Sequence, residues 1–175
     1  MSYLISGIQQ VGVGVIDILE AGKWYRKNLG FDINIVDDNG TAEKMLRYTG
    51  GEPQKRHAII AINLQGGGGL EVWQYKTRKP QYPNFEVKMG DLGIYITKIK
   101  SKRIKEAYEA YKEKGINLLS GIEKDPAGNE HFFFEDPYGN VFQIVNEHSI
   151  FAGTKALSGG VYGAVIGVSD IDASV

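Results

Sequence analysis

One nine-residue pattern occurs three times along the chain, and this repetition constrains the fold more than any other feature. The segment QVGVGVIDI (10–18) aligns without gaps on DLGIYITKI (91–99), and GAVIGVSDI (163–171) aligns on both. Apolar residues alternate with small or polar ones, as in strands with one buried face. The alignment matches three apolar residues of the first copy to three of the second: Val11, Val13 and Val15 to Leu92, Ile94 and Ile96. We therefore expect repeated units that each begin with a strand.

An amphipathic segment follows each of the first two strands. In DILEAGKWYRKNLGF, apolar residues recur at helical spacing, and we expect Asp17 to cap the start and Gly30 to end the helix. In SKRIKEAYEAYKEKGI, the corresponding residues are Ser101 and Gly115. Three apolar stretches follow each helix, at 31–36, 57–64 and 70–75, then at 116–119, 131–136 and 140–146. The order strand, helix, strand, strand, strand thus occurs twice.

These elements predict an α+β fold of tandem βαβββ units. The first unit spans 1–76, a linker spans 77–89, and the second unit spans 90–148. Residues 149–175 contain a further linker and the start of a third unit that stops after one helical turn. The extra stretch 38–56 is expected to form a short helix or hairpin over a pocket. The glycine run QGGGG (65–69) joins two strands and is expected to be a hairpin loop, because no helix follows to bind phosphate.

Composition narrows the class of partner. The net charge of −1 over 175 residues gives no electrostatic reason to expect nucleic acid or a membrane surface. No apolar run approaches the roughly 20 residues of a membrane span. Because the chain has no cysteine, any metal would need carboxylate, amide or histidine ligands. We expect a cytoplasmic protein, forming a homodimer, whose ligand or substrate is a small molecule.

Three short motifs point to a family. Val15-Ile16-Asp17, the helical WYRKNLGF and the turn in EDPYGNVFQI follow one another in order over residues 7–148. In this order and spacing the chain resembles the vicinal oxygen chelate superfamily, which contains glyoxalases, bleomycin-resistance proteins and extradiol dioxygenases. The resemblance implies paired units whose mixed sheet curls into a bowl, with the helices outside. It also implies that the concave face holds a divalent metal ion and the substrate.

Strand alternation indicates which side chains would line that concave face. Val11, Val13 and Val15 should face the helix, so Gln10, Gly12 and Gly14 face the bowl, where the glycines leave room. By the same rule the candidate ligand-pocket residues are Gly12, Gly14, Trp73, Tyr75 and His131. Four polar side chains would converge from equivalent strands: Gln10, Glu71, Asp91 and Gln143.

The resemblance places the family's metal ligands at these four polar positions, where metal-binding members usually carry histidine and glutamate. Two carboxylates and two amides suit a hard cation such as Mg²⁺, Mn²⁺ or Ca²⁺, with Ni²⁺ a further candidate, and suit Zn²⁺ poorly. The alternative is a polar lining that binds an organic ligand without any metal. A register slip of one residue would replace Asp91 by Leu92 and remove one carboxylate.

Three functions are compatible with this site. The first is a glyoxalase-like lyase or isomerase, in which Glu71 is the natural general base because Trp73 and Tyr75 would partly desolvate it. The second is a non-catalytic, bleomycin-resistance-like module that stacks a flat ligand on Trp73 and Tyr75. The third is the structural half of a larger dioxygenase-like protein, which the incomplete third repeat suggests.

Overall fold

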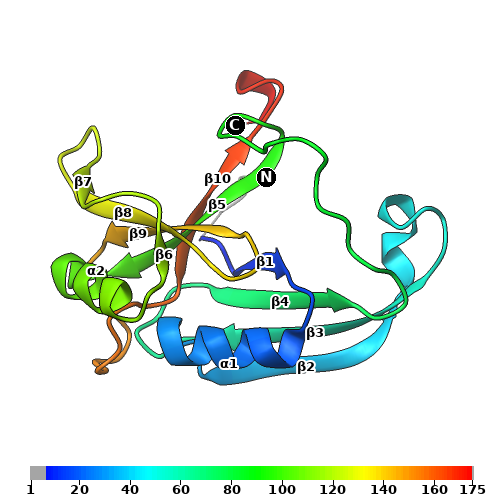
Figure 1. The fold of residues 1–175 in the computed structure, drawn as a ribbon, viewed down its shortest axis with the longest axis horizontal. Coiled ribbons are helices and arrows are strands. Elements are labelled where there is room, and N and C mark those ends of the chain that lie inside the picture. The colour runs from blue at the N-terminus through cyan, green and yellow to red at the C-terminus, as the bar shows by residue number, and fades with distance from the viewer. Residues whose placement is uncertain (1–6, 175) are drawn as a thin grey trace, which may run out of the picture.

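The computed structural model describes residues 7–174, and it contains a βαβββ unit, a second unit of the same order with one additional short strand, and a final strand (Figure 1). The first unit contains β1 (Gln10–Gly14), α1 (Ile18–Leu29), β2 (Ile33–Ala42), the 3-10 helix η1 (Glu43–Tyr48), β3 (Gln54–Ile62) and β4 (Gly69–Tyr75). The second contains β5 (Gly93–Ser101), α2 (Ile104–Glu113), β6 (Asn117–Leu118), β7 (Glu123–Lys124), β8 (Glu130–Glu135) and β9 (Val141–Asn146). The chain continues through β10 (Val161–Gly167) and the 3-10 helix η2 (Asp172–Ser174). The predicted α+β class is confirmed.

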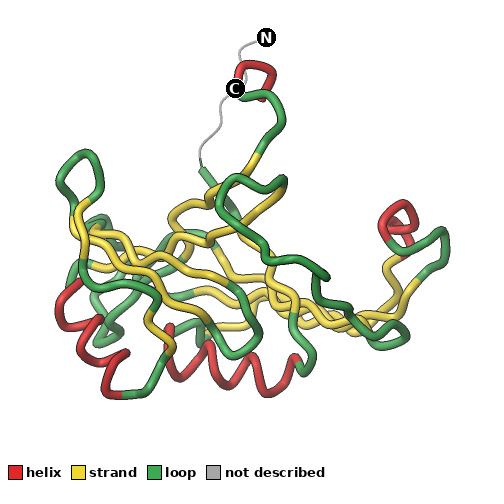
Figure 2. Tube along the Cα trace, turned by 45° about the horizontal axis from the view of Figure 1, so that its top comes forward, coloured by secondary structure: helices red, strands yellow, loops and turns green. Residues whose placement is uncertain are grey.

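The strands form two sheets with matching topology. The first sheet has the order β1-β4-β3-β2, and the second has the order β10-β5-β9-β8-β6, with β7 paired to β8. In each unit the first strand pairs in parallel with the last, β1 with β4 and β5 with β9. Figure 2 shows both α-helices on one side of the strands, while the linker between the units crosses the opposite side. That opposite side is the concave face.

The helices begin and end largely where the sequence predicts. Asp17 accepts hydrogen bonds from the amides of Leu19 and Glu20, and Gly30 ends α1 at a φ of 72°. This left-handed conformation favours glycine. The expected cap of α2 was wrong: Arg103 is the N-cap, and the Ser101 hydroxyl accepts a bond from the Arg103 amide and donates one to the Leu157 carbonyl.

The core lies between each sheet and its helix. From α1 and α2 it takes one buried stripe each: Ile18, Ala21, Tyr25 and Leu29, then Ile104, Ala107 and Tyr111. Val11 and Val13 on β1 are buried, whereas Gly12 and Gly14 are exposed, so the predicted alternation of β1 is confirmed. Apolar burial on this scale is the main stabilising contribution to the fold.

The predicted register of the second unit was wrong. Gly12 pairs with Glu71 in the first unit, and Lys98 pairs with Gln143 at the equivalent position of the second. Gly12 therefore corresponds to Lys98, and Gln10, two residues before Gly12, corresponds to Ile96. Asp91 lies five residues earlier, in a turn before β5, where its carboxylate accepts a bond from the Lys88 amide. The apolar residues that suggested the earlier register are largely exposed, Leu92 by 73% and Ile94 by 57%.

The glycine run connects β3 to β4, as expected, and it also joins the first unit to the start of β10. Gly68 donates to the Val161 carbonyl at 2.7 Å and accepts from the Val161 amide at 2.8 Å. Gly160 donates to the Gly66 carbonyl at 2.9 Å. A Cβ added at Gly160 would lie 2.7 Å from the Gly68 carbonyl oxygen. The two backbones therefore approach at a distance that only glycine permits.

Two further segments differ from their simplest prediction. The stretch 38–56 extends β2 and β3 into a long hairpin tipped by η1 (Figure 1), and the start of the linker contacts it: the Thr77 hydroxyl accepts from the Lys55 amide, and Arg78 donates to the Tyr48 carbonyl. The third repeat forms β10, which pairs antiparallel with β5. Asp170 accepts a bond from the Ala173 amide, much as Asp17 does at the start of α1. Across residues 7–174, no helix is long and apolar enough to cross a membrane.

Candidate functional site

A cavity of about 450 Å³ opens on the concave face between the two units. Its walls come from β1, the end of β4, the start of β5 and the turn after β8, and the linker supplies the remaining wall. Five aromatic side chains line it: Trp73, Tyr75, Tyr82, Tyr95 and Tyr138. Among residues 7–174, no charged side chain contributes to this lining. The cavity is therefore suited to an uncharged, largely apolar ligand.

Trp73 and Tyr75 are adjacent on the same face of β4. Their ring centroids are 5.8 Å apart and the planes meet at 72°, an edge-to-face arrangement. The Arg56 guanidinium lies 5.0 Å from the Trp73 ring centroid, and Asp38 pairs with Arg56 at 2.5 Å. These contacts fix the orientation of Trp73, so that its ring is a preformed surface for stacking.

Gly12 and Gly14 make space in this cavity. A Cβ added at Gly14 would meet no atom within 4 Å, and one at Gly12 would approach only Glu71, at 3.6 Å from Oε2. Neither glycine is required by its backbone conformation, because neither has a positive φ. The absence of a side chain here leaves volume for a ligand.

The polar residues predicted for the metal site do not converge. Gln10 donates to Glu71 Oε2 at 2.8 Å, so the structure brings these two together beside Gly12, although neither lines the cavity. In the second unit the position equivalent to Gln10 is Ile96, and Asp91 lies outside the strand. Gln143 is buried on β9 between Lys98 and Phe133.

This donor set does not fit the divalent ion that the family resemblance implies. Gln10 and Glu71 offer one amide and one carboxylate, whereas Ile96 offers no ligand atom. Hard cations take about six oxygen ligands, several of them from carboxylates. Within residues 7–174, no group of three or more histidine, aspartate or glutamate side chains is arranged to hold a metal.

His131 lies away from the cavity. It is buried on β8, edge-on to Phe133 with ring centroids 5.2 Å apart, and it pairs with Val145 and Glu123. Its Nδ1 atom has no hydrogen-bond partner among the described residues. His131 therefore does not line the space between Trp73 and the linker.

The turn from Asp136 to Asn140 positions two lining residues, Tyr138 and Asn140. The buried Asp136 carboxylate accepts bonds from the Tyr138 amide at 2.8 Å and the Asn140 amide at 2.9 Å. Tyr25 of α1 donates its hydroxyl to the same carboxylate at 2.5 Å. Burial, and then the negative charge of Asp136, raise the pKa of Tyr25 well above its usual range. Tyr25 therefore stays protonated and ties the first unit to this turn.

Sequence reasoning missed three of the five aromatic residues that line the cavity. Tyr82, Tyr95 and Tyr138 were not proposed, because they lie in the linker, on the misregistered strand and in a turn. One signal was present: Tyr82 stands between Gln81 and Pro83 in a segment with two prolines, which restrict its conformation. An aromatic residue held in such a segment is a reasonable candidate for a binding contact.

Comparison with known proteins agrees with the fold. The sequence profile of the Glyoxalase/Bleomycin resistance protein/Dioxygenase superfamily matches residues 7–144. The structure is similar to a glyoxalase family protein from Bacillus cereus, with a TM-score of 0.63 and 14% identity over 82% of this chain and 95% of that one.

Two further solved structures are similar at the same level. A glyoxalase family protein from Enterococcus faecalis superposes with a TM-score of 0.59 and 20% identity, covering 80% of this chain and 97% of the other. A glyoxylase/bleomycin resistance protein/dioxygenase domain from Frankia gives a TM-score of 0.58 and 13% identity, covering 83% and 100%. At these identities the likeness establishes the fold alone.

Proposed function

Because the chain belongs to the Glyoxalase/Bleomycin resistance protein/Dioxygenase superfamily, we propose that its concave cavity binds an uncharged, flat aromatic small molecule. The observation that carries this proposal is the lining: five aromatic side chains and no charged one among the described residues. A flat ring would stack on Trp73, whose orientation Arg56 fixes. Tyr82 of the linker would contact the ring from the other side of the cavity.

The two tryptophans of the chain make this proposal directly testable. Trp73 lines the concave cavity and Trp24 lies on α1, so the two indole N–H signals in a ¹⁵N-correlated NMR spectrum report on different places. Trp24→Phe and Trp73→Phe assign them. We expect the neutral probe naphthalene-2-carboxamide to shift the Trp73 signal in a saturable manner.

Filling the cavity should abolish this response. Gly14→Leu introduces a side chain where a Cβ meets no atom within 4 Å, so the fold should tolerate it while the ligand volume is lost. Gly121→Leu is the matched control, because Gly121 also has free space but lies outside the cavity. If the carboxamide binds Gly14→Leu as tightly as wild type, the cavity is not its site.

Glu71 favours a second candidate, proton transfer by a glyoxalase-like lyase or isomerase. Its carboxylate lies beside Gly12, which lines the cavity, and it accepts a hydrogen bond from Gln10. A carboxylate within reach of a bound substrate can act as a general base. Glu71→Gln should then abolish turnover of an enolisable aromatic ketone while its binding, read from Trp73, is retained. Equal turnover by wild type and Glu71→Gln would refute this role.

The metal-dependent form of that activity has its own test. An ion bound by the folded state raises thermal stability in proportion to the logarithm of its concentration. Since Gln10 and Glu71 are the only predicted ligands among residues 7–174 that meet, we expect no such increase on titration with Mn²⁺, Mg²⁺ or Ni²⁺. A saturable increase that Glu71→Gln removes would establish a metal site.

A further inference from the structure

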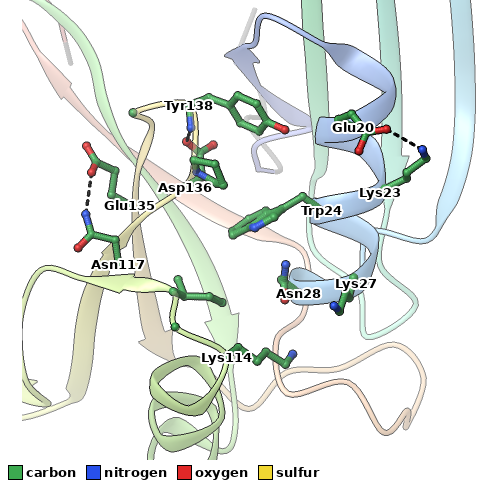
Figure 3. Close-up of a pocket in the computed structure, with 14 residues that line it drawn as sticks. Glu20, Lys23, Trp24, Lys27, Asn28, Lys114, Asn117, Glu135, Asp136 and Tyr138 are labelled. Carbon is green, nitrogen blue, oxygen red and sulfur yellow. Dashed lines mark hydrogen bonds and ion pairs between the residues drawn. The ribbon is translucent and has the colours of Figure 1, made fainter.

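A second and larger cavity lies on the opposite side of the sheets from the concave cavity. This groove of about 830 Å³ separates α1 from the second unit (Figure 3). One helical face of α1 forms one wall, at Glu20, Lys23, Trp24, Lys27 and Asn28. The end of α2 through β6 (114–117) and the turn after β8 (135–139) form the other wall.

The middle of the groove presents an aromatic surface. Trp24 reaches from α1 into the space between the two units (Figure 3). It is partly buried and rests edge-on against Tyr25, with ring centroids 5.3 Å apart at 89°. Ile116 and Tyr138 of the second unit extend the apolar surface. A flat ring could stack on the indole face that this packing leaves open.

Two lysines at one end of the groove form no ion pair with any residue of 7–174. Figure 3 shows Lys114 extending across the groove toward Lys27 and Asn28. No ion pair among residues 7–174 includes Lys27 or Lys114. Two like charges converging on one space repel each other, and an anion between them would relieve that repulsion. The amide of Asn28 adds a neutral hydrogen-bond donor at the same end.

The acidic side chains of the groove are already engaged. Glu20 pairs with Lys23 at 2.6 Å, and Glu135 accepts a bond from Asn117 at 2.8 Å. Asp136 is buried and accepts the hydroxyl of Tyr25. The donors to Glu135 and Asp136 are neutral, so these carboxylates keep their charge, and the lining contains three acidic and three basic side chains. Among residues 7–174, Lys27 and Lys114 are the basic side chains of this lining without an ion pair, and Figure 3 shows them on the other side of Trp24 from Glu135.

From this juxtaposition we infer that the groove is a second binding site, specific for a flat aromatic ring that carries an anionic group. The ring stacks on Trp24, and the anion lies between Lys27 and Lys114. The site differs from the concave cavity in chemistry as well as place, since the concave cavity has no charged lining residue among those described.

The test compares two probes that differ only in charge, naphthalene-2-carboxylate and naphthalene-2-carboxamide. The carboxylate should shift the Trp24 indole signal in a saturable manner, and at least about tenfold more tightly than the carboxamide does. Lys27→Gln combined with Lys114→Gln should weaken carboxylate binding by about tenfold and leave carboxamide binding unchanged. Inorganic phosphate, which has no ring, should bind more weakly than the carboxylate.

Arg26→Gln is the matched control, because it removes a charge from the same helix outside the groove. It should leave carboxylate binding within twofold of wild type. A Trp24 signal that does not move, or that moves equally in the double lysine variant, would overturn the inference. The Trp73 signal, read in the same spectra, tests the concave cavity independently, so either site can fail alone.

Discussion

Removing the hydroxyl of Tyr25 tests how firmly the two units are tied together. Tyr25 is 1% exposed, and its hydroxyl donates to Asp136 at 2.5 Å. Tyr25→Phe keeps the ring, so no cavity forms, and Asp136 keeps the amide donors of Tyr138 and Asn140. A hydrogen bond to a charged group contributes about 1.5–3 kcal/mol. We therefore expect the free energy of unfolding to fall by about 2 kcal/mol.

Urea unfolding followed by circular dichroism at pH 7 measures this loss, with Tyr48→Phe as the control. Tyr48 is 70% exposed, so its variant should stay within about 0.5 kcal/mol of wild type. A Tyr25→Phe variant as stable as Tyr48→Phe would refute the tie between α1 and the turn.

The pH dependence supplies an independent check. Burial raises the pKa of Tyr25 and of Tyr111 in the folded state, whereas an unfolded tyrosine titrates near pH 10. The stability linked to these raised pKa values is fully present below about pH 10. Above it the unfolded chain loses protons that the folded chain retains, so stability should fall by about 1.4 kcal/mol per pH unit for each tyrosine. Tyr25→Phe should fall with a shallower slope, because one of the two groups is gone.

Two further predictions concern the contact between Gly160 and the glycine run, and Tyr138, which lines both cavities. Gly160→Ala should lower the free energy of unfolding by about 2 kcal/mol or more, because the added Cβ would lie 2.7 Å from the Gly68 carbonyl oxygen. Urea titrations measure this loss, and Gly153→Ala, whose Cβ meets no atom within 4 Å, should leave the stability unchanged. Tyr138 lines both cavities, so Tyr138→Ala should weaken the carboxamide at Trp73 and the carboxylate at Trp24 together, by about threefold or more each in NMR titrations. Loss at one site only would show that Tyr138 does not contribute to both.

The elements that sequence predicted well are those with a strong local signal. Asp17 and Gly30 bound α1 in both sequence and structure, because a capping carboxylate and a left-handed glycine leave few alternatives. The alternation of Val11 and Val13 with glycine identified the two faces of β1. The expected homodimer, the cytoplasmic location and the boundaries of the units stay predictions.

The register of β5 could not be read from alternation, because this strand is apolar in both phases. Ile94 and Ile96 belong to one alternating series and Thr97 and Ile99 to the other, and Ile99 of the second series is buried in the core together with Ile104 of α2. The start of the following helix would distinguish the two registers, but the N-cap of α2 is Arg103, whereas that of α1 is Asp17. Without that aspartate, the sequence favoured the alignment of Leu92 with Val11 over the correct alignment of Thr97 with Val11. The repeat pattern indicated the strand β10, but a comparison of single strands could not show that it pairs with the edge of β5.

Correcting this register changes where specificity should be sought. The concave polar pair of the first unit, Gln10 and Glu71, corresponds to Ile96 and Gln143 in the second, so the repeat does not supply a symmetric set of ligands. The side chains that give the concave cavity its aromatic character, Tyr82 and Tyr138 among them, instead come from the linker and a turn. Loops tolerate substitution better than paired strands do, since fewer backbone hydrogen bonds depend on them. Ligand preference in this chain should therefore follow changes in residues 80–87 and 136–140 more closely than changes in the repeated strands.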